Sequence, residues 1–282
     1  MAVELATQYS PAVDEMFTTE SKLSLLTNND YSWAGAHAVR VYKVSTASMN
    51  DYGRGGPDVD NWSRYGDVQG LNATTQLLTL GRDRAFTFAL DALDMEETVS
   101  ALRAASALAR QIREVVIPEV DTYVYAAMCS EAGAKPDPLT LSATNIYGEI
   151  LNASLALDDA EVPETNRVLV VTPAVYALMK KSKDIVMETD IGMDMRLRGV
   201  ISNLDGMNVI RVPTVRLPAG FGFLLCHPSA TVSPVKLESY KTHQDPPGIS
   251  GALVEGRIVY DAFVLENKAK ALYYQAQSGT TP

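Results

Sequence analysis

Hydrophobic residues are spaced along the chain in a way that predicts both strands and helices. Residues 37–46 alternate between apolar and polar and are rich in β-branched residues, as a strand requires. Residues 95–116 instead carry apolar residues at steps of three and four, which predicts a long helix. Asp94 is a candidate N-cap for this helix, and Pro118 is expected to end or kink it. A second helix is predicted from Pro118 to Ala132.

A long β-ribbon is predicted ahead of the first helix. Residues 74–90 predict two strands joined by a tight turn at Gly81-Arg82-Asp83-Arg84, and residues 37–46 add a further strand. Residues 50–70 hold five glycines, one proline and four aspartates, which is typical of a long exposed loop. Because an isolated ribbon is only marginally stable in water, we expect a neighbouring molecule to stabilise it.

Residues 139–227 predict a mixed α/β unit. A helix near 141–157 is followed by an apolar strand at 168–171, and Thr172-Pro173 begins another helix. Asp205-Gly206 is a turn. The remaining apolar runs predict strands near residues 208–212, 221–226, 232–241, 253–265 and 271–276.

The first 34 residues predict an extended arm. Ser10 and Pro11 can begin a short helix, but its apolar stripe of Val13, Met16 and Phe17 is sparse. A segment that buries so little needs another surface to lie on.

Composition and charge narrow the class of protein. The 282 residues are 46% hydrophobic and 21% charged, as in ordinary globular proteins. The net charge of −10, with acidic and basic residues mixed throughout, argues against strong general binding to nucleic-acid phosphates. No signal peptide is visible, and no apolar stretch reaches the roughly 18 residues of a membrane span. We therefore expect synthesis in a cytoplasm and no association with a membrane.

Motifs of catalysis and metal binding are missing from the sequence. It contains no phosphate-binding loop, no nucleophile elbow and no zinc motif. Cys129 and Cys226 are isolated in sequence, and Cys226-His227 is poorly placed to share a metal because neighbouring strand residues point to opposite faces. The acidic groups Asp51, Asp58 and Asp60, and Asp158, Asp159 and Glu161, fit solvated loops and turns better than a site. We predict no catalytic, cofactor-binding or metal-binding residues.

Five segments, in order, resemble the major capsid proteins of tailed bacteriophages, which have the Hong Kong 97-like fold. They are Leu77–Thr98, Val115–Asp121, Val168–Tyr176, Asp205–Pro213 and Val254–Lys268. Each segment is a weak signal alone, but their order and spacing span nearly the whole chain. The resemblance implies an α+β subunit that self-assembles into the icosahedral shell of a phage head, and no enzymatic activity.

The resemblance also implies a division of the chain. Residues 1–36 would be an N-terminal arm, 37–92 an extended loop, 93–138 and 228–282 a P-domain with the long spine helix, and 139–227 an A-domain. Hexamers and pentamers would enclose double-stranded DNA without reading its sequence. A portal and a separate scaffold protein would be partners, and the subunit would be made in the host bacterial cytoplasm before entering the virion capsid.

Charged residues on the ribbon are candidate assembly contacts. We hypothesise that Arg40, Lys43, Arg82, Asp83 and Arg84 form ion pairs between subunits, since the ribbon offers them little to pack on. The alternative is that they are simply solvated, because exposed pairs contribute little. Lys43 has no identifiable asparagine partner, so no covalent crosslink is predicted.

Two other functions are consistent with parts of the pattern. An encapsulin-like nanocompartment would keep the fold but hold cargo enzymes, and the distinct N-terminal arm argues against it. A small soluble α/β enzyme would be a compact monomer or small oligomer with a pocket, and it leaves the ribbon unexplained.

Overall fold

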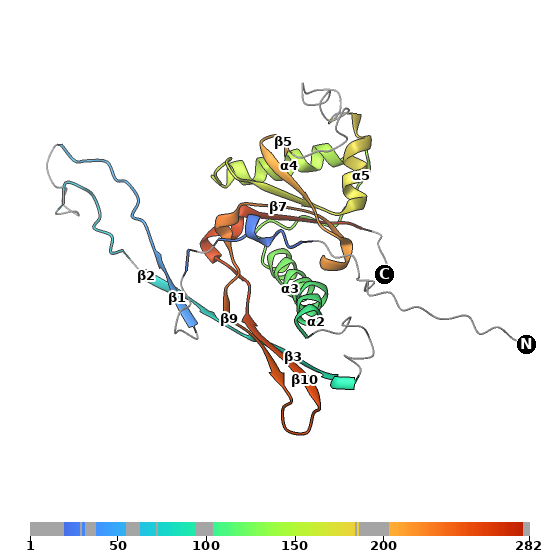
Figure 1. The fold of residues 1–282 in the computed structure, drawn as a ribbon. Helices are drawn as coiled ribbons and strands as arrows, with labels where there is room; N and C mark the ends of the chain where they lie inside the picture. Colours follow the sequence, from blue (N-terminus) through green and yellow to red (C-terminus); the bar gives the residue numbers. More distant parts are fainter. Residues whose placement is uncertain are drawn as a thin grey trace, which may run out of the picture. The chain divides into compact units, whose positions relative to one another are not determined.

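The structure, a computed structural model, describes residues 20–28, 30–31, 38–54, 63–71, 73–93, 104–183, 185 and 203–278. The chain divides into two compact units (Figure 1). The smaller unit is Gly35–Thr79, and the larger unit combines Met1–Ala34 with Leu80–Pro282. Each unit has its own sheet structure and is described separately below.

The smaller unit is a two-stranded antiparallel ribbon. Strand β1 (Ala38–Val44) pairs with β2 (Ala73–Thr79) from Ala38 opposite Thr79 to Val44 opposite Ala73. Beyond the strands, the side-chain amide of Asn50 donates to the carbonyl oxygens of Tyr65 and Asp67 at 3.2 and 3.3 Å. The two arms of the connection therefore continue to bond to each other past the end of the strand pairing.

The predicted tight turn at Gly81-Arg82-Asp83-Arg84 is wrong. Strand β3 (Arg82–Asp91) follows β2 directly but joins a different sheet, in which the order is β3-β10-β9. Its partner is β10 (Gly251–Tyr260), which pairs on its other side with β9 (Val235–Gln244). The pairing of β3 with β10 runs over ten residues, from Asp91 opposite Gly251 to Arg82 opposite Tyr260, and bonds the backbone along the whole of β3.

The predicted spine helix is continuous past Pro118. Helix α2 (Ala104–Gln111) passes through a π-helical turn, η2 (Ile112–Val116), into α3 (Ile117–Ser130). Pro118 lies in the first turn of α3. The π turn has already interrupted the regular hydrogen-bond pattern there, so the missing N–H of proline costs little. The expected break at Pro118 does not occur, and the N-cap candidate Asp94 lies outside the described residues.

A five-stranded sheet forms the other layer of the larger unit. Its order is β12-β7-β4-β6-β5, with β4 parallel to β6 and β7 antiparallel to β4. The strands are β4 (Val168–Val171), β5 (Asn203–Leu204), β6 (Met207–Arg211), β7 (Phe221–Cys226) and β12 (Leu272–Ala276). Strand β12 belongs to the segment 228–282 that the sequence assigned to the P-domain, yet it pairs with β7 of the predicted A-domain.

Two helices accompany this sheet, α4 (Ile146–Asp159) and α5 (Pro173–Lys181) (Figure 1). Every residue of β4 and β7 is buried, which explains why both are unbroken apolar runs and not alternating ones. Helix α5 begins as predicted, because the Thr172 hydroxyl accepts from the Val175 N–H at 3.1 Å. The main core joins α3, α4, α5 and this sheet.

Short elements complete the larger unit. Strand β8 (Thr231–Val232) pairs with β11 (Phe263–Val264). The 3₁₀ turns are η1 (Leu23–Leu25), η3 (Thr214–Arg216), η4 (Pro228–Ala230) and η5 (Glu266–Ala271).

The described part of the predicted arm has a surface in its own chain. Leu26 is fully buried and Leu23 nearly so, and both belong to the main core. The Asn28 N–H donates to the Thr231 carbonyl oxygen at 2.9 Å. The surface that this segment was expected to need is supplied, for the described residues, by its own chain. Ser10, Pro11 and the residues of the sparse apolar stripe lie outside the described residues.

Candidate assembly interface

Groups that could support catalysis or metal binding are scattered or already engaged. Among the residues that the structure describes, no three His, Cys, Asp or Glu side chains gather closely enough to hold a metal ion. Burial raises the pKa of the Cys129 thiol to about 12 and the pKa of the Cys226 thiol further still. Asp158 forms an ion pair with Arg167 at 2.7 Å. Asp58 and Asp60 lie outside the described residues.

None of the described helices is long and apolar enough to cross a membrane.

The predicted interface charges on β3 have partners within the subunit. The Asp83 carboxylate accepts from the Arg257 guanidinium at 2.9 Å, and this hydrogen bond lowers the pKa of Asp83. Arg84 donates to Glu119 at 2.6 Å, which raises the pKa of Arg84. These contacts exist because β3 pairs with β10 and lies near α3, not in the hairpin that the sequence predicted. All four side chains remain exposed by a third or more.

Arg82 is engaged differently. Its guanidinium lies 4.4 Å from the centroid of the Tyr123 ring, a cation–π distance. The Tyr123 hydroxyl donates to Asp261 at 2.7 Å, and burial together with this bond raises the pKa of Tyr123.

The other two predicted charges, Arg40 and Lys43, lie on β1 of the ribbon, opposite Leu77 and Thr74 of β2. Arg40 is exposed and Lys43 half-buried. The structure thus places Arg82, Asp83 and Arg84 together on β3 and keeps Arg40 and Lys43 in the other compact unit.

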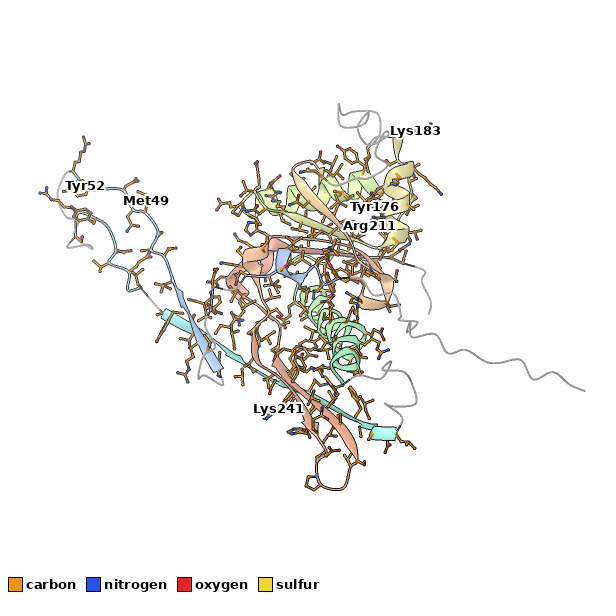
Figure 2. The ribbon with its side chains drawn as sticks, viewed as in Figure 1. Met49, Tyr52, Tyr176, Lys183, Arg211 and Lys241 are labelled. Atoms are coloured by element: carbon orange, nitrogen blue, oxygen red, sulfur yellow. The ribbon has the colours of Figure 1, made fainter. Side chains whose placement is uncertain are left out.

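Exposed apolar residues of the ribbon are the feature that charge-based reasoning missed. Tyr42 is 73% exposed and Val44 is 60% exposed, and the two share one face of β1. Further apolar or aromatic side chains stand in solvent along the unit, and two of them are labelled in Figure 2: Met49, Tyr52, Tyr65, Val68, Leu71 and Leu77. A two-stranded ribbon that exposes this much apolar surface is typical of a segment that another chain covers. The alternation of Tyr42 and Val44 in the sequence was the signal that could have indicated this apolar face of the ribbon.

The base of β3 is fixed by one buried carboxylate. Asp261, 5% exposed, accepts from the Gly81 N–H and the Tyr123 hydroxyl at 2.7 Å each, and from the Ala262 N–H at 2.8 Å. Gly81 is the residue just before β3. Asp261 thereby determines where the chain enters the three-stranded sheet.

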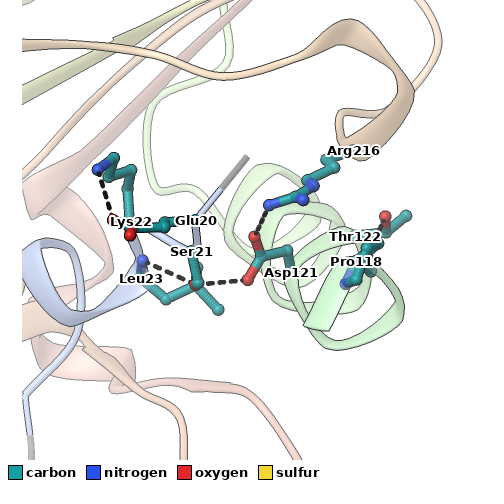
Figure 3. A network of polar contacts seen from close by, with 8 residues as sticks. All are labelled: Glu20, Ser21, Lys22, Leu23, Pro118, Asp121, Thr122 and Arg216. Carbon is teal, nitrogen blue, oxygen red and sulfur yellow. Dashed lines mark hydrogen bonds and ion pairs between the residues drawn. The ribbon is translucent and has the colours of Figure 1, made fainter. Parts of the chain in front are cut away.

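A second buried carboxylate joins the N-terminal segment to the core (Figure 3). Asp121 on α3 is 2% exposed, accepts from the Ser21 hydroxyl at 2.6 Å and forms an ion pair with Arg216 at 2.8 Å. Burial raises the pKa of Asp121, and the bonds from Ser21 and Arg216 oppose that rise. Three distant segments of the sequence therefore meet at one charge.

Known proteins share this architecture. A family model described as "Phage capsid protein" matches residues 72–275, well over half of the chain. The structure of Mycobacterium phage Che8 is 18% identical, with a TM-score of 0.80 over 98% of both chains. The capsid of cyanophage P-SCSP1u is 12% identical, with a TM-score of 0.76 over 98% of this chain and 93% of that one. The mature capsid of bacteriophage PhiM1 is 13% identical, with a TM-score of 0.74 over 99% and 93%. No curated protein sequence matches the chain.

These matches decide between the functions that the sequence left open. The α+β, Hong Kong 97-like capsid fold is confirmed by the neighbouring structures. The family match confirms the prediction of a subunit that assembles into a shell and not the alternative of an enzyme. It covers the three-stranded sheet, the long helix and the five-stranded sheet. The chain belongs to the phage capsid protein family.

Proposed function

We propose that this chain forms the hexamers and pentamers of a tailed phage's icosahedral head, which encloses double-stranded DNA without reading its sequence. The observation that carries the proposal is the ribbon β1–β2. Its sheet contains only two strands, and it exposes Tyr42, Val44 and Leu77 to solvent. A two-stranded ribbon is marginally stable at best in water, and a neighbouring subunit that covers this one would stabilise it.

The proposed division of labour follows the predicted segments. Residues 1–36 act as the arm and 37–92 as the extended loop, residues 93–138 and 228–282 as the P-domain, and 139–227 as the A-domain. The net charge of −10 suits a wall that surrounds DNA without holding it closely. A portal and a separate scaffold protein are proposed partners, and synthesis takes place in the host bacterial cytoplasm.

All five predicted charges, Arg40 and Lys43 on the ribbon and Arg82, Asp83 and Arg84 on β3, are proposed to serve the contacts between subunits. Exposed ion pairs such as Arg84–Glu119 contribute little to one subunit, so they can exchange partners when subunits meet. Reversing Arg84 to Glu should therefore impair assembly. Adding Glu119→Arg restores the internal pair, so a shell defect that persists in the double variant reports a contact with another subunit. Normal shells from both variants would refute the role of Arg84.

The test of the overall proposal is size-exclusion chromatography with light scattering, then negative-stain microscopy of the leading peak. Closed shells or capsomer-sized rings are expected, and shells from infected or induced cells should contain double-stranded DNA. Shells that hold an enzyme and no DNA would favour the encapsulin-like alternative. A 30.6 kDa monomer at every salt and protein concentration would refute assembly.

A further inference from the structure

The five-stranded sheet carries opposite charges at the two ends of its parallel strands. Strand β4 begins at Val168, next to the acidic turn after α4, and ends at Val171, next to the start of α5. Arg211, the last residue of β6, is the register partner of Val171. At about 3.3 Å per residue, β4 alone separates the two ends by about 10 Å.

The basic end is built around the ring of Tyr176 (Figure 2). The Arg211 guanidinium lies 4.6 Å from the ring centroid, and the Lys180 ammonium lies 5.2 Å from it. Lys181 and Lys183 are exposed nearby on the same turn of chain. Among the described residues, none of these four cations has a carboxylate within ion-pair distance. Two exposed cations on one ring therefore form a positive surface, and the described residues supply no carboxylate that pairs with it.

The acidic end is the turn between α4 and β4. Arg167, 3% exposed, donates to the carbonyl oxygens of Val162 and Pro163 at 2.6 and 3.0 Å and thereby fixes the turn. Arg167 also neutralises Asp158. The neighbouring carboxylates Asp159, Glu161 and Glu164 are exposed. In the described part of the chain, those three have no cation within ion-pair distance.

Apolar side chains accompany both charged ends. Leu155 is 59% exposed on α4, and Asp159 follows it by four residues, so both lie on the same face of the helix. Leu151, one turn earlier on that face, is 42% exposed. At the other end, Val215 is 86% exposed, four residues after Arg211. Each end thus combines charge with an apolar contact, as interface cores and rims do.

We propose that the basic end of one copy binds the acidic end of the next copy, head to tail, around the capsomer ring. This inference rests on the proposed function and names one interface within it. A head-to-tail contact between two different patches generates a ring when its rotation closes. Opposite charges favour this pairing, while basic-to-basic and acidic-to-acidic encounters repel, so the charges also set the direction of the ring.

Charge reversal and its rescue test the proposal. Lys180→Glu, Lys181→Glu and Arg211→Glu together make both ends acidic, and Glu161→Lys with Glu164→Lys makes both ends basic. Each set should raise the protein concentration needed for assembly roughly tenfold or more, since like charges then face each other. All five substitutions together restore opposite charges and should restore assembly. Because exposed charges are screened, the defects should shrink with added salt.

Matched controls separate a lost contact from a damaged subunit. Lys241→Glu reverses an exposed charge on β9, in a different sheet from both ends, and should assemble normally. Circular dichroism and thermal unfolding should show every variant folded. Wild-type assembly by both reversed variants, or no rescue in the combined variant, would overturn this inference alone. Failure of the wild-type protein to form rings or shells would instead overturn the proposed function.

Discussion

Replacing Arg216 should show how much unfolding free energy is lost when the buried carboxylate of Asp121 has no counter-charge. The ion pair has side chains only 5% and 3% exposed, with 2.8 Å between the Arg216 nitrogen and the Asp121 oxygen. In Arg216→Met, the aliphatic stem is largely retained, but Asp121 loses its counter-charge. The carboxylate would then be buried with the Ser21 hydroxyl as its one remaining side-chain donor among the described residues.

The expected loss is about 3–5 kcal/mol of unfolding free energy at neutral pH, as for other buried pairs that lose one partner. The Coulomb attraction of two unit charges at this distance and an effective dielectric constant near 20 is about 6 kcal/mol, and the desolvation of both ions offsets part of it. Burial already raises the pKa of Asp121, and removing Arg216 raises this pKa further. A carboxyl whose folded pKa is raised favours the folded state when protonated, and that contribution is lost as pH rises through the folded pKa. The Arg216→Met loss should therefore be smaller in acid.

Urea unfolding of unassembled subunits, followed by circular dichroism at about pH 7 and about pH 4, measures both effects. Adding Asp121→Asn should recover much of the loss at neutral pH, because the amide is neutral and its oxygen still accepts from Ser21. The control Arg257→Met breaks the exposed pair with Asp83 and should change stability little at either pH. A loss below about 1 kcal/mol, or an equal loss at both pH values, would refute the idea that Asp121 is buried as a charge.

Three further experiments test other parts of the structure. Thr172→Ala removes the N-cap of α5 and should cost about 1 kcal/mol in urea unfolding, while Thr172→Ser should cost much less. Gly256→Ala places a methyl group 2.3 Å from the Phe86 ring and should lower the melting temperature markedly. Its control Gly148→Ala has open space around the new methyl group and should raise stability by up to about 1 kcal/mol. Equal effects of the two variants would contradict the packing of the three-stranded sheet. Cys129 and Cys226 should resist a thiol-specific reagent near pH 8 until the protein unfolds, since burial raises both pKa values; rapid labelling of the native protein would contradict their burial.

Local signals predicted the five-stranded sheet well. The runs at 168–171 and 221–226 are apolar at every position because both faces of β4 and β7 are covered, and the structure has these strands with those bounds. Thr172-Pro173 and Asp205-Gly206 carry their own conformational preferences. Asp205 and Gly206 adopt φ of 48° and 75°, values that such turn residues tolerate.

Pairings between distant segments could not be predicted in the same way. Nothing near Arg82 indicates that β3 prefers β10, whose partner residues lie some 160 to 180 positions later. The same pairing explains the contacts of the predicted interface charges. Asp83 contacts Arg257 and Arg84 contacts Glu119 because β3 pairs with β10 and not in the predicted hairpin. The burial of Leu26 has no local signal either, because its neighbours in the core come from other parts of the chain.

The anchoring of the N-terminal segment also has a consequence for the order of folding during synthesis. Ser21 bonds to Asp121, 100 residues later, and the Asn28 side chain bonds to the Ser229 carbonyl oxygen, 201 residues later. The Gly81 N–H likewise donates to the carboxylate of Asp261, which is synthesised much later. The ribosome releases these early residues well before their partners, so the larger unit cannot close until nearly all of the chain has emerged. Such long-range closure makes folding slow, and nascent chains must remain soluble with their core strands uncovered until β12 joins the sheet.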